Sequence, residues 1–378
     1  MRNKEGDEIL ENCRILFIVP NLRIGTGVTS VIMNHYGKLI KEGYCVDFCL
    51  LQDRESPFFK VVQENGGHIF AMPSGNNGYP DKKKTPYFIE QILKKEKYKI
   101  VHIHIVGRFA VYTSYYAKKY QVPFRIYHAH NPRDVHDFKS FVASMLFDNL
   151  SVVLNNCYLA CSKEAGKSVF RGKNFNVIKN TIDTEKLKYS SLNREKFRKK
   201  FDIKKDVFVV GTVCRISYQK NPYYLVDIFE KVQEIKKDSI LVWAGSGDLE
   251  KNIEQYIESK GLSNKVLLLG DCSDVASLYA AMDVFVLPSR YEGLGIVYIE
   301  AQASGLTTFA SNVVPKDTKI TELINYLPLN ESPEFWAKKI ASVESDTQDR
   351  ETYSKIIADA GYDTSLNNDL INYYSRLK

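Results

Sequence analysis

The sequence predicts an α/β protein with two doubly wound, Rossmann-like domains that face each other across a cleft. Three observations lead to this prediction. Short apolar runs alternate with helical patterns, the alternation stops in a polar stretch and then restarts, and the chain has 378 residues. A chain of this length exceeds one ordinary hydrophobic core and fits two domains. Nearly continuous apolar runs are typical of strands that are buried on both faces of a parallel sheet.

The first half of the chain opens with the apolar run RILFIVP at 14–20, which predicts a buried strand. A glycine-containing loop and a helical pattern at 28–41 follow it. The other strands of this half are expected at 44–51, 68–72, 100–105, 124–128, 158–161 and 176–178, with helices at 86–97 and 110–120. The charge run DKKK at 81–84 is expected in a solvated loop. This alternation predicts a doubly wound parallel sheet.

A polar, basic stretch at 180–205 is expected to form the crossing between the domains. The alternation restarts after it, with strands expected at 207–213, 239–244, 266–269, 284–288 and, as the last one, 307–310, and with helices at 221–235, 248–260, 275–281 and 296–303. We expect a first domain at 1–185, completed by a returning helix at 362–378, and a second domain at 186–361. Ligands bind such folds at the carboxyl ends of the strands.

The net charge of +7 is unevenly distributed along the chain. Residues 1–180 carry 26 Lys and Arg against 16 Asp and Glu, a net charge of +10, whereas 181–378 carry 26 against 29, a net charge of −3. A basic first half favours an anionic partner, such as nucleic acid, an anionic bilayer or a phosphorylated lipid. No zinc-ligand spacing or helix-turn-helix signal supports nucleic acid. A merely solvated basic face remains the alternative.

The compartment is predicted from what the sequence lacks. No run of 18 or more apolar residues is present, and residues 1–11 are too charged for a secretory signal. The seven cysteines are odd in number and never spaced C-x2-C, which predicts reduced thiols in a cytoplasmic protein. The apolar-rich stretch 136–153 could place Phe138, Phe141, Met145 and Leu146 in a membrane interface, or form a helix packed on the sheet.

The strongest motif is RYEGLGIVYIEAQASG at 290–305. Glu292 and Glu300 lie eight positions apart across a glycine-containing turn that opens a helix. The N–H groups of 293–295 would then lie at a helix amino end, where a phosphate is favoured. A carboxylate on each side could bind the hydroxyls of a sugar and a ribose. A glycine-flanked loop followed by a helix with a solvated glutamate is the alternative.

A second motif, GTVCRISYQKN at 211–221, directly follows an expected strand. It places Arg215 and Lys220 on a loop at the carboxyl end of that strand. An Arg fork and a Lys point charge can together neutralise a departing diphosphate. Basic loop residues are common, so the pair alone is weak evidence for a phosphate site. The strand before it and the two glutamates after it favour that role.

The Arg-x4-Lys pair and the E-x7-E motif together resemble glycosyltransferase family 4, also called the group 1 glycosyltransferases, which has the GT-B fold. The text around them is similar to the branch that builds capsular and exopolysaccharides: YHAHN at 127–131, LACSKEAGKSVF at 159–170, VIKNTID at 177–183 and MDVFVLPSRYEGL at 282–294. Thr181 departs from the family pattern, which often has Gly there.

The resemblance implies roles for residues of the second half. Arg215 and Lys220 would hold the donor diphosphate and stabilise it as leaving group. Glu292 would bind the hydroxyls of the donor sugar, Glu300 the nucleoside ribose, and main chain near 271–274, including Asp271, the base. Backbone contacts to the donor would come from Gly293, Leu294 and Gly295.

Residues of the first half would complete the site. Gly25 and Gly27 would let the chain approach the donor phosphates and the acceptor closely. His128, at the end of its strand, would lie near the transferred sugar. His130 and Asn131 match the same family motif and are candidates for contacts with sugar or acceptor. A strand-end histidine with a purely structural hydrogen bond is the alternative.

The resemblance also implies an activity, which is a retaining transfer of a sugar without a metal or cofactor. The donor would be a nucleoside-diphosphate sugar, with UDP expected. The acceptor would be a saccharide on a polyprenyl diphosphate, met at the inner face of the cell membrane by a peripherally bound protein. No D-x-D motif in an apolar strand context provides a site for a divalent cation.

The sequence also bears on three other functions. A sugar-nucleotide epimerase of the same fold and a non-catalytic scaffold of a polysaccharide assembly complex remain open as alternatives. A Rossmann-type oxidoreductase is disfavoured, because the segment at 25–30 (GTGVTS) lacks the third glycine of the dinucleotide fingerprint.

Overall fold

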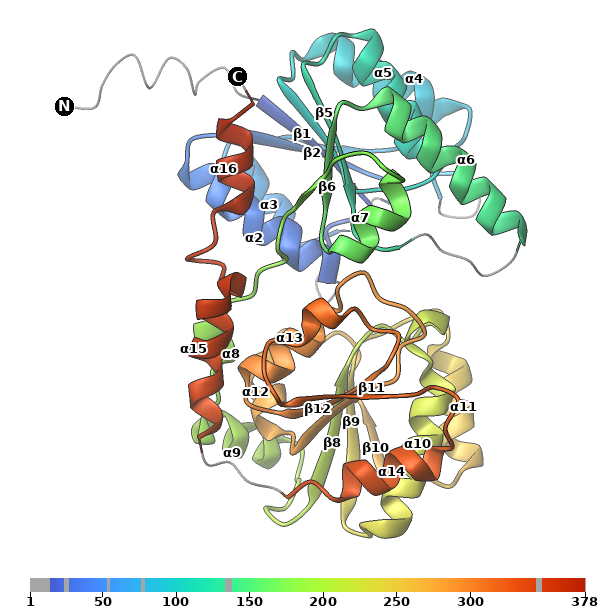
Figure 1. Cartoon of the computed structure of the whole chain (residues 1–378), viewed down its shortest axis with the longest axis vertical. Helices are drawn as coiled ribbons and strands as arrows, with labels where there is room; N and C mark the ends of the chain where they lie inside the picture. The colour runs from blue at the N-terminus through green and yellow to red at the C-terminus, as the bar shows by residue number, and fades with distance from the viewer. Residues whose placement is uncertain are drawn as a thin grey trace, which may run out of the picture. The chain divides into compact units, whose positions relative to one another are not determined.

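The computed structural model describes residues 14–23, 27–52, 55–75, 79–132, 138–344 and 349–377, except the side chains of 138–140. The chain splits into two compact units, Met1–Lys179 with Asn368–Lys378, and Asn180–Asn367 (Figure 1). Each unit has a parallel sheet with helices on both faces. This confirms the predicted α/β fold class with two doubly wound sheets.

The sheet of the first unit has the order β3-β2-β1-β4-β5-β6-β7 in the described part of the chain. Its strands are β1 (Arg14–Val19), β2 (Cys45–Leu50), β3 (Ile69–Ala71), β4 (Ile100–Ile103), β5 (Phe124–Ala129), β6 (Cys157–Ala160) and β7 (Asn176–Val177). Residues 15–19 of β1 are buried, as expected for a central strand that is covered on both faces. The apolar run that predicted this strand therefore forms the middle of the core.

Helices cover both faces of this sheet. They are α2 (Gly27–Lys41), α3 (Phe58–Glu64), α4 (Lys84–Lys95), α5 (Arg108–Lys119), α6 (Phe138–Leu154), α7 (Lys163–Phe170) and, from the end of the chain, α16 (Asp369–Ser375). α16 packs against α2, so the end of the chain lies on the first unit. α3 was not predicted. α4 starts within the charge run that was expected to be a loop, because the Asp81 side chain accepts hydrogen bonds from the N–H groups of Lys83 and Lys84.

The sheet of the second unit has the order β10-β9-β8-β11-β12-β13 within the described residues. Its strands are β8 (Phe208–Val213), β9 (Ser239–Ala244), β10 (Val266–Leu268), β11 (Val284–Leu287), β12 (Thr307–Ser311) and β13 (Ile324–Leu327). The expectation that 307–310 is the last strand was wrong, because β13 pairs with β12 at the sheet edge. In β13 only the two end residues are buried, so its sequence, INYL, carries a weak apolar signal.

The helices of the second unit include two in the stretch that was expected to be a plain crossing. The α-helices are α8 (Thr184–Leu187), α9 (Ser191–Lys200), α10 (Pro222–Ile235), α11 (Glu250–Ser259), α12 (Val275–Ala281), α13 (Ile296–Ala303), α14 (Pro333–Ala341) and α15 (Tyr353–Ile357). Asp183 caps α8 and Ser190 caps α9 by accepting backbone hydrogen bonds. The expected boundary at residue 185 falls inside α8, which packs on α12, α13 and α15, and the structure divides the chain before it.

α9 is joined to the sheet by a buried ionic network. Asp283, directly before β11, accepts hydrogen bonds from Arg194 at 2.6 Å, from Arg198 at 2.9 Å and from the N–H of Val209 at 2.7 Å. Both arginines come from α9. Arginines that appear in the sequence as a basic linker are therefore structural residues of the second unit.

Two further observations concern the chain as a whole. Within the described residues, no helix is both long enough and apolar enough to cross a membrane. The cysteines there are free thiols: Cys45, Cys49, Cys157, Cys161, Cys214 and Cys272. Burial raises the pKa of the Cys49 thiol to about 12 and that of Cys214 to about 11, so both are inert protonated groups at neutral pH.

Replacing Asp283 by Ala should destabilise the second unit by about 3 to 5 kcal/mol, because the buried Arg198 and the largely buried Arg194 would lose their counter-charge. Chemical unfolding followed by circular dichroism measures this change. Asp238→Ala is a matched control, since Asp238 is exposed and its change should stay within about 0.5 kcal/mol. Equal stability of the two variants would contradict the structural role of the network.

Candidate functional site

Lys220 and Glu292 form an ion pair at the carboxyl edge of the second sheet. Lys220 ends a 3-10 helix, η1 (Tyr218–Lys220), in the loop after β8, and Glu292 lies in the turn before α13. The Lys220 Nζ donates to Glu292 Oε1 at 2.6 Å, and both side chains are largely buried. The sequence predicted both residues in separate roles but not their pairing.

Further hydrogen bonds hold these two loops together. Ser289 Oγ donates to the same Glu292 Oε1 at 2.6 Å. Gln219 Nε2 donates to the carbonyl of Tyr291 at 3.0 Å, while the N–H of Arg290 donates to the carbonyl of Gln219 at 2.8 Å. The loop after β8 and the loop after β11 therefore form one connected surface.

The turn before α13 depends on glycine. Gly295 has φ = 79°, and a Cβ atom there would lie 2.6 Å from the ring of Tyr298, so a larger residue would be strained and would clash. The turn places Gly293 and Leu294, both buried, directly before the amino end of α13. The first N–H groups of a helix and its dipole favour an anion at this end.

Glu300 lies on α13 and is partly exposed. Its Oε2 accepts a hydrogen bond from the hydroxyl of Tyr279 at 2.8 Å. Burial raises the pKa of the Glu300 carboxyl, whereas the hydrogen bond from Tyr279 lowers it. The hydroxyl of Tyr279, on α12, thus orients the carboxyl group of Glu300.

Arg215 is exposed on the loop after β8, and the described residues make no hydrogen bond or ion pair with its guanidinium. Beneath it, two glycines let the loop after β9 approach closely. A Cβ atom on Gly245 would lie 2.1 Å from the carbonyl oxygen of Cys214, and one on Gly247 would lie 2.0 Å from that of Ile216. Sequence reasoning missed these glycines, although the motif AGSGD at 244–248 directly follows a strand.

Asp271 belongs to the same edge of the sheet. Its carboxylate accepts a hydrogen bond from Ser246 at 3.1 Å, and the N–H of Gly245 donates to the carbonyl of Gly270 at 2.7 Å. Loops after four neighbouring strands, β10, β9, β8 and β11, thus place Asp271, Arg215, Lys220 and Glu292 at one edge of the sheet, with Glu300 on the helix that follows the last loop. This surface combines a free guanidinium, a paired ammonium, a helix amino end and oriented carboxylates, which suits a ligand with phosphates and hydroxyls.

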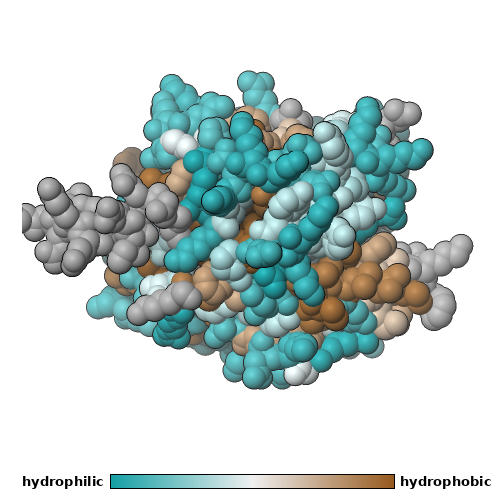
Figure 2. All heavy atoms as spheres, turned by 90° about the horizontal axis from the view of Figure 1, so that it is seen from above, coloured by the Kyte–Doolittle hydropathy of each residue, from teal (hydrophilic) through white to brown (hydrophobic). Residues whose placement is uncertain are grey.

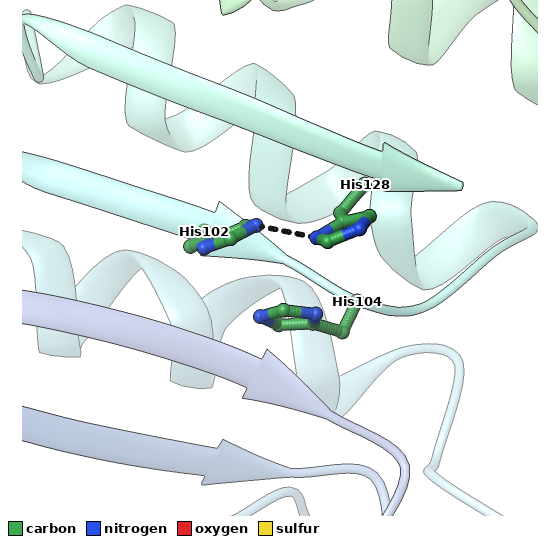
Figure 3. Close-up of side chains that lie close together, drawn as sticks. All are labelled: His102, His104 and His128. Carbon is green, nitrogen blue, oxygen red and sulfur yellow. Dashed lines mark hydrogen bonds between the residues drawn. The ribbon is translucent and has the colours of Figure 1, made fainter. Parts of the chain in front are cut away.

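In the first unit, the buried side chains of His102, His104 and His128 lie together where β4 and β5 end (Figure 3), and the half-buried His130 extends this stack. His102 Nε2 lies 3.1 Å from His128 Nδ1, and His104 Nδ1 lies 2.8 Å from His130 Nε2. Because side chains alternate along a strand, residues two apart share one face of the sheet. The alternation of His in IVHIHI and in YHAHN gave the signal for this cluster, but only His128 and His130 were identified from it.

The histidine stack is tied to the end of the chain. The Tyr374 hydroxyl, on α16, lies 2.6 Å from His102 Nδ1. Burial lowers the pKa of His102, His104 and His128 well below the usual range, and lowers that of His130 to about 4. The imidazoles are therefore neutral at pH 7, and their hydrogen bonds are between neutral rings.

One ring nitrogen each of His102, His104 and His128 lies within 4.8 Å of the other two, a spacing that could hold a metal ion. The ring geometry favours hydrogen bonding instead. His102 and His104 have ring centroids 4.0 Å apart with planes at 32°, and both nitrogens of His102 already have partners. The lone pair of an imidazole nitrogen lies in the plane of its ring. Because the rings lie one over another, their lone pairs run side by side and do not converge on one metal ion.

The other predicted residues of the first unit have varied positions. Gly25 lies outside the described residues. Gly27 is the exposed first residue of α2, and Asn131 is exposed in the bend after β5. The structure places His130 inside the stack with His128, and gives Asn131 no part in it.

Comparison with known proteins finds similarity over both units. The family described as Glycosyl transferases group 1 matches residues 193–360. The putative glycosyltransferase EpsF of Bacillus subtilis is 27% identical over 376 residues, which cover 96% of this chain and 96% of the relative. The Escherichia coli UDP-Gal:alpha-D-GlcNAc-diphosphoundecaprenol alpha-1,3-galactosyltransferase is 31% identical over 308 residues, or 76% of each chain.

Solved structures support the fold. The crystal structure of Anabaena HepE in complex with UDP and glucose aligns with a TM-score of 0.76 at 20% identity, covering 96% of this chain and 100% of that chain. Two parallel sheets in the orders described above match GT-B glycosyltransferase structures. This confirms the GT-B fold that the motifs predicted.

The histidine stack predicts that acid weakens the fold. Because His130 has a pKa of about 4 in the folded chain and about 6.5 when unfolded, the unfolded chain binds more protons between these values. Stability is therefore full above pH 6.5 and falls as the pH drops toward 4, by about 1.4 kcal/mol per pH unit for each such histidine. Chemical unfolding at pH 7, 6 and 5 measures the slope.

The variant His130→Gln should flatten that slope by about 1.4 kcal/mol per pH unit. His68→Gln is the control, because the His68 side chain is more than half exposed and lies outside the stack. An unchanged slope in the His130 variant would contradict a neutral, buried imidazole at this position.

Proposed function

The chain belongs to the group 1 glycosyltransferases, and we propose that it transfers a sugar from a UDP-sugar to a saccharide on a polyprenyl diphosphate, with retention of configuration. Its relatives support the substrates: the E. coli protein is described by a UDP-galactose donor and a diphosphoundecaprenol acceptor. HepE has been crystallised with UDP and glucose. The product would be a capsular or exopolysaccharide, in line with the similarity to EpsF.

The observation that carries the proposal is the convergence of Arg215, Lys220 and the α13 amino end on one edge of the second sheet. A diphosphate placed there would meet the exposed Arg215 guanidinium and the Lys220 ammonium. It would also meet the turn at Gly293, Leu294 and Gly295. Fixed positive groups at a departing phosphate are the kind of electrostatic stabilisation that usually contributes most to catalysis.

The carboxylates would orient the rest of the donor. Glu292 would bind hydroxyls of the sugar while remaining paired with Lys220, so sugar and diphosphate would be held by one connected group. Glu300, oriented by Tyr279, would bind the ribose hydroxyls. Asp271, on the loop beside Ser246, would mark the end of the site that receives the base.

The transfer step would need no protein base. The bond between the anomeric carbon and the phosphate oxygen breaks, and the acceptor hydroxyl bonds to the same face of that carbon. The acceptor proton passes to the leaving phosphate oxygen, whose charge Arg215 and Lys220 neutralise. Attack on the face that the leaving group vacates retains the configuration of the sugar.

His128 would contact the transferred sugar, with His130 and Asn131 on the acceptor side. The His128 Nε2 is buried and has no hydrogen-bond partner within the described residues, whereas its Nδ1 is engaged with His102. A neutral imidazole that is oriented through one nitrogen can present the other to a sugar hydroxyl as a donor or an acceptor.

Arg215→Ala should weaken UDP binding by about tenfold to a hundredfold, because a charge-assisted hydrogen bond contributes about 1.5 to 3 kcal/mol. Isothermal titration with UDP, GDP, ADP and NAD measures this loss and identifies the base. Lys205→Ala is the matched control, since Lys205 is exposed and lies before β8, at the opposite end of the same strand. Equal UDP affinity in the two variants would reject the donor site.

A transfer assay with a UDP-hexose and a polyprenyl-diphosphate-linked saccharide then separates the possible activities. The proposal predicts a longer lipid-linked glycan with the donor's anomeric configuration, and no product from Lys220→Ala. Interconversion of UDP-sugars without an acceptor would identify an epimerase. UDP binding without either reaction, across a panel of hexose and N-acetylhexosamine donors, would favour a scaffold.

A further inference from the structure

Three neighbouring helices of the first unit, α4, α5 and α6, surround an apolar pocket on its surface. The pocket has a volume of about 490 Å³. Its lining comes from all three helices: Pro86, Val111, Tyr112, Tyr115, Tyr116, Leu150, Val153 and Leu154. None of these side chains is charged, so the pocket offers contacts mainly to apolar groups.

An exposed apolar stripe on α6 continues from this pocket. Its residues follow at intervals of four, four and three, which places them on one face of a helix. Their exposed fractions are 40% for Val142, 54% for Leu146, 42% for Leu150 and 71% for Val153. An area of apolar side chains is visible at the right of Figure 2, on the side where Figure 1 places α6.

This stripe corrects the face that the sequence predicted. Phe141 and Met145 of the expected face are half-buried, and the side chain of Phe138 lies outside the described residues. α6 packs on α5, and its exposed apolar face is the one that contains Leu146. The helix is therefore both packed on the unit and apolar on its outer side.

Tyrosines and lysines border the apolar surface. Tyr87 on α4 and Tyr115 on α5 are more than half exposed. The run 82–84 at the start of α4 adds three exposed lysines, and Lys118 on α5 is also exposed. The nearby Glu90 carboxylate is neutralised by Lys119 at 2.6 Å. The surface thus combines apolar, aromatic and cationic groups; of the carboxylates beside it, Glu90 is paired with Lys119 and Asp81 accepts hydrogen bonds from the N–H groups at the start of α4.

We propose that the surface formed by α4, α5 and α6 docks on an anionic bilayer. Tyrosine favours the boundary between water and lipid, apolar stripes enter the outer part of the acyl region, and lysines near the surface are attracted to anionic lipids. A protein partner would need carboxylates to match the lysines, whereas an anionic bilayer supplies both the charge and the apolar phase. Docking on a bilayer would place the enzyme beside the lipid-linked acceptor, so the inference rests on the proposed function.

The test is flotation with vesicles of phosphatidylcholine alone and of phosphatidylcholine with phosphatidylglycerol. The wild-type chain should float with the anionic vesicles. Replacement of Leu146, Leu150 and Val153 by Ser should lower the bound fraction about tenfold or more. The matched control replaces Leu192, Ile235 and Leu366 by Ser; these apolar residues of the second unit are each more than half exposed, and their replacement should leave binding unchanged.

A second pair of variants tests the charge. Lys82→Gln with Lys83→Gln should weaken binding to anionic vesicles, while Lys204→Gln with Lys205→Gln, two exposed lysines of the second unit, should not. Full binding by the α6 variant, or no binding by the wild type, would overturn the proposal. If light scattering shows that the wild type is a dimer and the α6 variant a monomer, the surface would instead bind a second copy of the chain, and the proposal would be overturned.

UDP titration separates this inference from the proposed function. The α6 variant should keep the UDP affinity of the wild type, because the proposed donor site lies in the second unit. Flotation without UDP binding would support docking on the bilayer and reject the donor site. UDP binding without flotation would support the donor site and reject docking on the bilayer.

Discussion

Lys220 and Glu292 form an ion pair that joins the loop after β8 to the turn before α13, and the other contacts of the candidate site are arranged around it. Two largely buried charges are costly to desolvate, and removing one partner would leave the other without compensation. The pair therefore fixes the spacing of the two loops. In the proposed function, a donor diphosphate at Lys220 would share that cation with Glu292, whereas the exposed Arg215 guanidinium would be available to the diphosphate alone.

The sequence predicted the fold where burial alone determines an element. β1 is buried on both faces, and its apolar run is unmistakable. β13 and α9 were missed because their stability comes from tertiary contacts. β13 completes a sheet edge with two buried residues, and α9 is rich in basic residues, two of which are held by Asp283. Elements of this kind are recognised only when their partners in space are known.

The candidate site was predictable where a motif directly follows a strand, because Arg215, Lys220 and Glu292 could each be named as candidates from their own motif. The pairing of Lys220 with Glu292 was not predictable, since it depends on two loops that are far apart in the sequence. His102 and His104 were missed for a different reason, because an alternating His pattern in a strand becomes a cluster only when the neighbouring strand carries the same pattern. The requirement for glycine at position 245 follows from its close approach to the carbonyl of Cys214, which the sequence does not show.

The central claim is that the carboxyl edge of the second sheet binds the nucleoside diphosphate of the donor. Hydrogen exchange with and without saturating UDP tests it most directly, since bound ligand slows the opening of the backbone that it contacts. The account predicts slower exchange at 215–221 and at the start of α13, 293–298. Slower exchange confined to the first unit, or no change anywhere at saturating UDP, would contradict it.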